Sequence, residues 1–201
     1  MAELGFTVWF TGMSGSGKST LAEQLRETLI GRGLHVEWLD SARIRRELNR
    51  DLGFTRADIE TNLRRLGYEC KMLNRNGVIA LVSAISPYRE VRNAIREDIG
   101  RFFEVYCRCP LETLVQRDEH NLYERADRGE IKNVAGINAP YEEPLKPEVA
   151  VETDRRTPEA CVAHIVKTAE ILGFLRTAQA SCYSPEEEDL IKRRLRDLGY
   201  M

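Results

Sequence analysis

The chain has 201 residues, 42% of them hydrophobic, which is enough for one well-buried core and short for two. Its formal net charge of -2 excludes the global positive field typical of nucleic-acid-binding proteins. No stretch approaches the roughly 18 uninterrupted apolar residues that span a bilayer, and the N-terminus enters the first predicted strand at once, so we expect a cytoplasmic protein without signal peptide or membrane contact.

The first predicted strand leads directly into a phosphate-binding motif. Residues 6–11 are aromatic and β-branched, as in a buried strand, and residues 18–31 carry leucines at helical spacing. The turn between them fits the pattern G-x-x-x-x-G-K-[ST] through Gly12, Gly17, Lys18 and Ser19. A Gly/Ser-rich turn could match by chance, but the order strand, loop, helix is the one that the motif requires.

This loop predicts the binding of a nucleoside triphosphate. Glycines let backbone N–H groups curl round a phosphate chain at the positive end of the helix dipole. Lys18 is expected to reach the β- and γ-oxygens and to act in catalysis, and Ser19 can ligate Mg²⁺. The predicted ATP-binding residues of the loop are Gly12, Ser14, Gly15, Ser16, Gly17, Lys18, Ser19 and Thr20.

The remaining elements alternate between strand and helix. Strands are predicted over residues 34–39, 78–85, 102–107 and 148–153, and helices over residues 41–48, 56–75, 88–100, 111–118 and 158–172. Such alternation predicts an α/β fold, a three-layer doubly wound parallel sheet of the P-loop nucleoside-triphosphate kinase type. Ligands then bind beyond the carboxyl ends of the strands.

Two segments fall outside this scheme. Residues 119–147 combine several glycines and prolines with charged residues, which favours a mobile flap over the site, with disorder of no function as the alternative. Residues 176–201 form a predicted C-terminal helical tail, in which Ser184 caps a helix that starts at Pro185 and could dock on the core or on a partner subunit. We therefore predict a kinase domain over 1–175, followed by this tail.

The five cysteines do not form a metal site by their spacing. Cys70, Cys107, Cys109, Cys161 and Cys182 are an odd set without the paired C-x-x-C spacing of zinc sites. Reduced packing residues are favoured over a redox role.

Nucleotide binding alone leaves three classes of protein open: a small-molecule kinase, a GTPase-like switch and an ATP-driven motor. The chain has no Asn-Lys-x-Asp guanine reader and is short for a motor. A compact kinase is favoured.

Longer strings of residues narrow this choice. They are residues 48–54 (Leu-Asn-Arg-Asp-Leu-Gly-Phe), 62–65, 85–89 (Ile-Ser-Pro-Tyr-Arg), 110–112, 117–118, 122–123, 129–132, 136–137 and 140–142. In this order, from about residue 5 to 175, the chain resembles the adenylylsulfate kinase (APS kinase) family. The resemblance implies transfer of the γ-phosphoryl group of MgATP to the ribose 3′-hydroxyl of adenosine 5′-phosphosulfate (APS), giving PAPS. It also implies a homodimer, with ATP sulfurylase as a candidate partner.

The resemblance also assigns site residues. It places the donor-nucleotide contact at Arg117 and the acceptor-binding residues at Arg45, Phe54, Asn62, Ile85, Ser86 and Lys132. A phosphosulfate needs fixed positive donors and an adenine needs a π-face. Structural alternatives remain for three of them: a helix-end arginine at 117, a packing side chain at 54 and a solvated lysine at 132.

The chain departs from the family pattern in three segments. Asp40-Ser41-Ala42 stands where the family has Asp-Gly-Asp, which leaves Asp40 as the candidate catalytic carboxylate. Ile59 replaces an arginine that would grip the phosphosulfate, and Val134 replaces a phenylalanine that would cover the acceptor adenine. Because all three touch the acceptor side, two alternatives stay open: a related kinase for another nucleotide-linked or sugar alcohol, and a catalytically weakened nucleotide-binding subunit.

Overall fold

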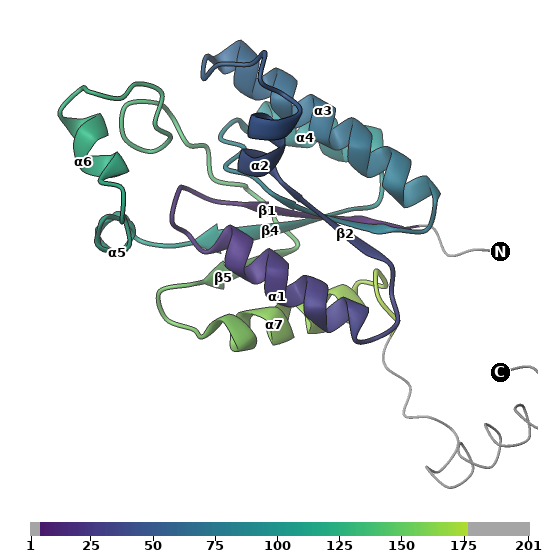
Figure 1. Cartoon of the computed structure of the whole chain (residues 1–201). Coiled ribbons are helices and arrows are strands. Elements are labelled where there is room, and N and C mark those ends of the chain that lie inside the picture. Colours follow the sequence, from purple (N-terminus) through teal and green to yellow (C-terminus); the bar gives the residue numbers. More distant parts are fainter. Residues whose placement is uncertain (1–4, 177–201) are drawn as a thin grey trace, which may run out of the picture.

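The computed structural model describes residues 5–176, which contain a parallel five-stranded sheet in the order β2-β3-β1-β4-β5 (Figure 1). The strands are β1 (Thr7–Thr11), β2 (Val36–Asp40), β3 (Ile79–Ser83), β4 (Phe102–Arg108) and β5 (Val149–Glu152). Every predicted strand is confirmed. The third is shorter than expected because the chain leaves the sheet after Ser83 and turns at Ser86, whose φ of 42° is incompatible with a strand.

Helices cover both faces of this sheet. They are α1 (Lys18–Ile30), α2 (Ser41–Glu47), α3 (Arg56–Arg75), α4 (Arg89–Ile99), α5 (Leu111–Gln116), α6 (Leu122–Asp127) and α7 (Pro158–Ile171). Figure 1 shows α1 and α7 on one face, α3 and α4 on the other, and α5 with α6 to one side. Local signals set two of the helix starts: Thr55 forms a capping box with Asp58, and Thr157 caps α7 ahead of Pro158.

The two sides of the sheet bury separate apolar clusters. In β1, Val8 and Phe10 join the cluster that packs under α1 and α7, whereas Trp9 joins the cluster under α3 and α4. Alternate residues of a strand point to opposite faces, so a strand buried on both faces must be apolar throughout. The predicted three-layer doubly wound sheet is confirmed.

A buried arginine connects helix α4 to the sheet and to the end of the predicted flap. Arg92 of α4 is 1% exposed, and its Nε donates to Glu104 Oε1 in β4 at 2.8 Å. Its two terminal nitrogens donate to the backbone oxygens of Ser86, at 2.5 Å, and Glu142, at 2.7 Å. One guanidinium thus holds three segments that are distant in the sequence.

The flap region contains a helix that the sequence did not predict, α6, and several buried side chains. Tyr123 is 3% exposed, and Val134 and Ala135 are similarly enclosed. Tyr123 also donates its hydroxyl to the backbone oxygen of Ser14 at 2.6 Å, so this region contacts the phosphate-binding loop. The helix was missed because only six residues form it and its N-cap, Asn121, has a left-handed conformation with no side-chain cap.

Other predictions concern the cysteines and the chain ends. Cys70, Cys107, Cys109 and Cys161 are free and buried, as expected of packing residues. Cys182 and the predicted tail helix lie outside the described residues, and the boundary at 175 stays a prediction. Between residues 5 and 176, no helix is both long and apolar enough to cross a bilayer.

Replacing Arg92 by Met should lower the free energy of unfolding by about 3 to 5 kcal/mol, because buried Glu104 would keep only Arg96 as an ionic partner and two backbone oxygens would lose their donor. The control is Lys71→Met, which breaks the exposed pair between Lys71 and Asp98 across α3 and α4 and should cost less than about 1 kcal/mol. Urea denaturation measures both. Equal losses in the two variants would contradict the role of burial.

Candidate functional site

One carboxylate joins the carboxyl ends of β2 and β3 to the phosphate-binding loop. Asp40, the last residue of β2, accepts hydrogen bonds at Oδ2 from Ser19 Oγ (3.0 Å) and from Ser83 Oγ (2.8 Å). Its Oδ1 accepts from the backbone N–H of Arg43 at 2.9 Å, which caps α2. Partial burial would raise the pKa of Asp40, but these hydrogen bonds outweigh it and lower the pKa below its usual range, so the side chain stays ionised.

Lys18, the first residue of α1, is enclosed by its own loop. The side chain is 9% exposed, and Nζ donates to the backbone oxygen of Met13 at 2.6 Å and to Ser16 Oγ at 3.4 Å. Burial lowers the pKa of Lys18 from 10.5 to about 8, an effect that nearby Asp40 and Cys107 partly oppose. The ammonium group therefore lies in a poorly solvated place that favours a negatively charged partner.

Two glycines of the loop are required by geometry. Gly12 has φ +151°, and a Cβ there would lie 2.6 Å from the backbone oxygen of Cys107. Gly17, the N-cap of α1, has φ +83°, in the left-handed region that other residues rarely adopt. The loop can therefore turn tightly from β1 into α1 with its backbone N–H groups at the helix N-terminus.

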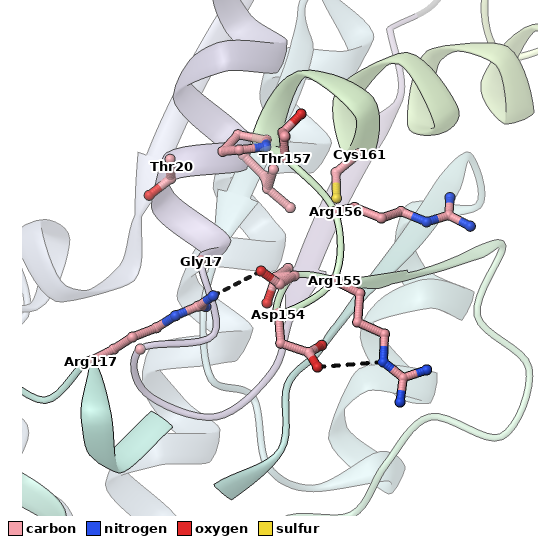
Figure 2. Close-up of a pocket in the computed structure, with 12 residues that line it drawn as sticks. Gly17, Thr20, Arg117, Asp154, Arg155, Arg156, Thr157 and Cys161 are labelled. Carbon is pink, nitrogen blue, oxygen red and sulfur yellow. Dashed lines mark hydrogen bonds and ion pairs between the residues drawn. The ribbon is translucent and has the colours of Figure 1, made fainter. Parts of the chain in front are cut away.

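A first cavity of about 570 Å³ lies on one side of the loop. Figure 2 shows Gly17 and Thr20 facing Arg117 and the segment between β5 and α7. Its lining residues are Gly15, Gly17, Thr20, Leu21, Arg117, Thr153, Asp154, Arg155, Arg156, Thr157, Pro158 and Cys161. Arg117 was predicted here, and its Nη2 donates to the backbone oxygen of Thr153 at 2.9 Å.

Sequence reasoning missed residues 153–157 in this cavity. No motif marks them, but they directly follow β5, and segments after parallel strands gather at one edge of the sheet. That rule could have placed them beside the loop.

A second cavity of about 490 Å³ lies on the other side of the loop, which it touches at Ser14. All six residues that the sequence assigned to an acceptor line it, and so do the three positions of departure. In chain order these nine are Ala42, Arg45, Phe54, Ile59, Asn62, Ile85, Ser86, Lys132 and Val134. The segments that bring them together are α2, α3, the end of β3 and the flap region. Arg46 and Tyr88 also line this cavity and were not predicted.

Two of the predicted acceptor residues are already bonded inside the protein. Asn62 is 1% exposed, donates to Ser41 Oγ at 3.0 Å and accepts from Asn49 Nδ2 at 2.9 Å. Ser86 Oγ accepts from Trp9 Nε1 and donates to Thr11 Oγ1, both at 3.0 Å. These side chains are rigid parts of the cavity wall.

Arg45 and Phe54, by contrast, lie at the open side of the cavity. Phe54 is 65% exposed, and the guanidinium of Arg45 stacks 4.9 Å from its ring centroid. Arg45 also donates to the backbone oxygen of Gly53. A packing role for Phe54 in the core is therefore wrong: the ring is presented to the cavity with an arginine against it.

The described part of the chain has no group of three or more His, Cys, Asp or Glu side chains that could hold a metal ion by itself. The Ser19 hydroxyl and the Asp40 carboxylate, 3.0 Å apart at the loop, are oxygen donors suited to Mg²⁺ that shares its other ligands with phosphates and water.

Comparisons with known proteins agree with this geometry. A family model described as adenylylsulphate kinase matches residues 4–152. An adenylyl-sulfate kinase of Microcystis aeruginosa is 47% identical over 180 residues, which cover 90% of this chain and 99% of that protein. A probable bifunctional SAT/APS kinase of Sorangium cellulosum is 47% identical over 171 residues, and this chain spans 29% of its length.

A solved structure extends the likeness to three dimensions. The Mycobacterium tuberculosis APS kinase in complex with AMPPNP and APS superposes with a TM-score of 0.78 at 40% identity. The match covers 83% of this chain and 98% of that one.

In the ligand-free protein, Lys18 should lose its proton near pH 8, because burial disfavours the charged form. Carbon-13 NMR of the lysine ε-methylene groups can follow this titration, with the Lys18→Arg variant identifying the resonance. The same resonance should titrate near 10.5 once urea has unfolded the protein. A folded-state midpoint equal to the unfolded one would refute the assignment.

Proposed function

The chain belongs to the adenylylsulphate kinase family, and from this we propose that it transfers the γ-phosphoryl group of ATP to the 3′-hydroxyl of APS, giving PAPS and ADP. The observation that carries the proposal is the pair of cavities on either side of one phosphate-binding loop. Phosphoryl transfer requires a donor and an acceptor hydroxyl in line across the transferred group, and this arrangement supplies one cavity for each.

On the donor side, we assign ATP to the loop and the first cavity. The backbone of residues 12–20 cradles the phosphates, and Lys18 exchanges its bond to the Met13 oxygen for the β- and γ-oxygens. Arg117, held by Thr153, presents its guanidinium plane to the adenine. Ser19 and Asp40 are the residues that would hold Mg²⁺, which neutralises charge on the phosphates when bound.

On the acceptor side, we assign APS to the second cavity, with Phe54 offering its ring to the adenine and Arg45 and Lys132 offering positive charge. Among the described residues that line this cavity, none is Asp or Glu. The cavity itself therefore supplies no carboxylate base. A loose transition state depends mainly on positioning and charge neutralisation, so the fixed geometry of Asn62 and Ser86 contributes more than proton abstraction.

A second candidate function rests on the three departures from the family pattern. Ala42, Ile59 and Val134 all line the acceptor cavity, and each offers an apolar surface. A related kinase that phosphorylates another nucleotide-linked or sugar alcohol would use the same donor site with such an altered acceptor wall. A third candidate function, which the same three positions leave open, is that of a nucleotide-binding subunit with weak activity.

We also propose a cytoplasmic homodimer. The buried free cysteines are typical of a reducing compartment. Tyr68 and Met72, one turn apart on α3, expose 64% and 43% of their surface and form an apolar strip that a second copy could cover. Association with ATP sulfurylase is a further proposal, since the Sorangium cellulosum relative is described as a probable bifunctional SAT/APS kinase.

The activity itself can be tested with purified full-length protein and MgATP. Release of ADP should rise strongly on addition of APS and little with AMP or water. Lys18→Ala should reduce the APS-dependent rate by about 100-fold or more, because the charge that stabilises the transferred phosphoryl group is lost. Lys167→Ala, at an exposed position of α7, is the control and should retain the rate. Stimulation by another alcohol but not by APS would favour a related kinase with a different acceptor. Nucleotide binding without turnover would favour a nucleotide-binding subunit with weak activity.

Sedimentation velocity should give a particle of twice the chain mass of 23.0 kDa. Tyr68→Glu should shift the protein toward the monomer, because a charge would be buried in the interface. Lys167→Glu, at the exposed site on α7, is the control and should leave the dimer intact. A monomer at all concentrations would refute the dimer.

A further inference from the structure

The acceptor cavity has an uneven distribution of charge. Its lining contains three permanently or normally cationic side chains, Arg45, Arg46 and Lys132, and no Asp or Glu among the described residues. A lining with cationic side chains and no anionic ones creates a positive potential inside a concave surface. The cavity is therefore suited to an anionic ligand. The contacts of each of the three cations within the protein indicate which of them is free to bind the anion.

Arg45 is largely committed to the protein. One face of its guanidinium lies on the ring of Phe54, and an N–H group donates to the backbone oxygen of Gly53. Asp58, at the start of α3, adds an electrostatic interaction with the same group. Arg45 thus fixes the position of Phe54 and adds positive charge to the cavity from there, but turning its guanidinium toward a ligand would cost these contacts.

Arg46 and Lys132 are in a different state. Neither side chain forms a hydrogen bond or an ion pair with any residue between 5 and 176, and both are exposed at the cavity. They come from separate segments, Arg46 from α2 and Lys132 from the region after α6. An arginine offers several N–H donors in a planar fork that matches the oxygens of sulfate and phosphate.

The side chains of α3 that line the cavity include no cationic group. Ile59 and Leu63 line it there, and both also contact or belong to the apolar cluster below. Asn62 lies between them on the same helix, but its amide is already bonded to Ser41 and Asn49. Any charge that binds the anion must come from α2 or from the flap region.

We propose that Arg46 is the anion anchor of the acceptor site, acting with Lys132 on the phosphosulfate group of APS, and that it sets the preference for an anionic acceptor. This inference rests on the proposed function. Arg46 binds the charged end while Phe54 binds the adenine, so the two residues fix opposite ends of the acceptor. No covalent role is assigned to either.

Steady-state kinetics of Arg46→Gln tests the inference. KM for APS should rise at least about tenfold, because a charge-assisted contact is lost, while KM for ATP and kcat change less than about twofold. Arg46→Lys, which keeps the charge but not the fork, should recover part of the loss. The matched control is Arg43→Gln, an exposed arginine of the same helix that does not line the cavity.

Calorimetry in the presence of ADP separates this role from a structural one. Arg46→Gln should weaken the binding of APS but leave that of adenosine unchanged, because adenosine lacks the anion. Equal weakening of both ligands, or an unchanged KM for APS in an active protein, would overturn the assignment of Arg46. A folded wild-type protein that neither turns over nor binds APS would overturn the proposed function, and with it this inference.

Discussion

The carboxylate of Asp40 is the interaction on which the site depends. It joins the end of β2 to the loop through Ser19, to the end of β3 through Ser83, and to the start of α2 through the Arg43 N–H group. A parallel sheet brings strand ends to one edge, but it does not lock them together. Because one charged group accepts all three hydrogen bonds, it holds the phosphate-binding loop and helix α2, which borders the acceptor cavity, in fixed positions relative to each other.

The two cavities differ in how they are supported. The donor cavity is built from the loop, from Arg117 at the end of α5 and from the segment that directly follows β5, so the sheet sets much of its shape. The acceptor cavity takes much of its wall from α2, α3 and the flap region, which lie outside the sheet. Arg92 supports this wall by donating to the backbone oxygen of Ser86, which lines the cavity, and to that of Glu142, in the flap region. The acceptor wall is therefore fixed by a few buried polar contacts, and its exposed side chains are free to differ.

This difference also explains what could be predicted from the sequence. Strands, most helices and the phosphate-binding loop follow from periodicity and local spacing, because each signal lies within a short stretch. The acceptor residues were identified through resemblance to a family. Arg46 was not found, because its neighbour Arg45 is also an arginine and only the fold shows that, within residues 5–176, the side chain of Arg45 is bonded and that of Arg46 is not. Similarly, residues 153–157 carry no motif, and their place in the donor cavity depends on which strand β5 pairs with.

The charged side chains of the two cavities differ in how far they are exposed to solvent. On the donor side, Lys18 loses solvation on folding, and Asp40 stays ionised beside it through hydrogen bonds that the fold supplies. On the acceptor side, the exposed cations keep their solvation, so they add attraction without the cost of burial. A buried charge must keep its partners, and changing it disturbs the loop. An exposed cation on α2 or the flap region can be gained or lost singly, which lets the acceptor site diverge while the phosphate-handling machinery stays the same.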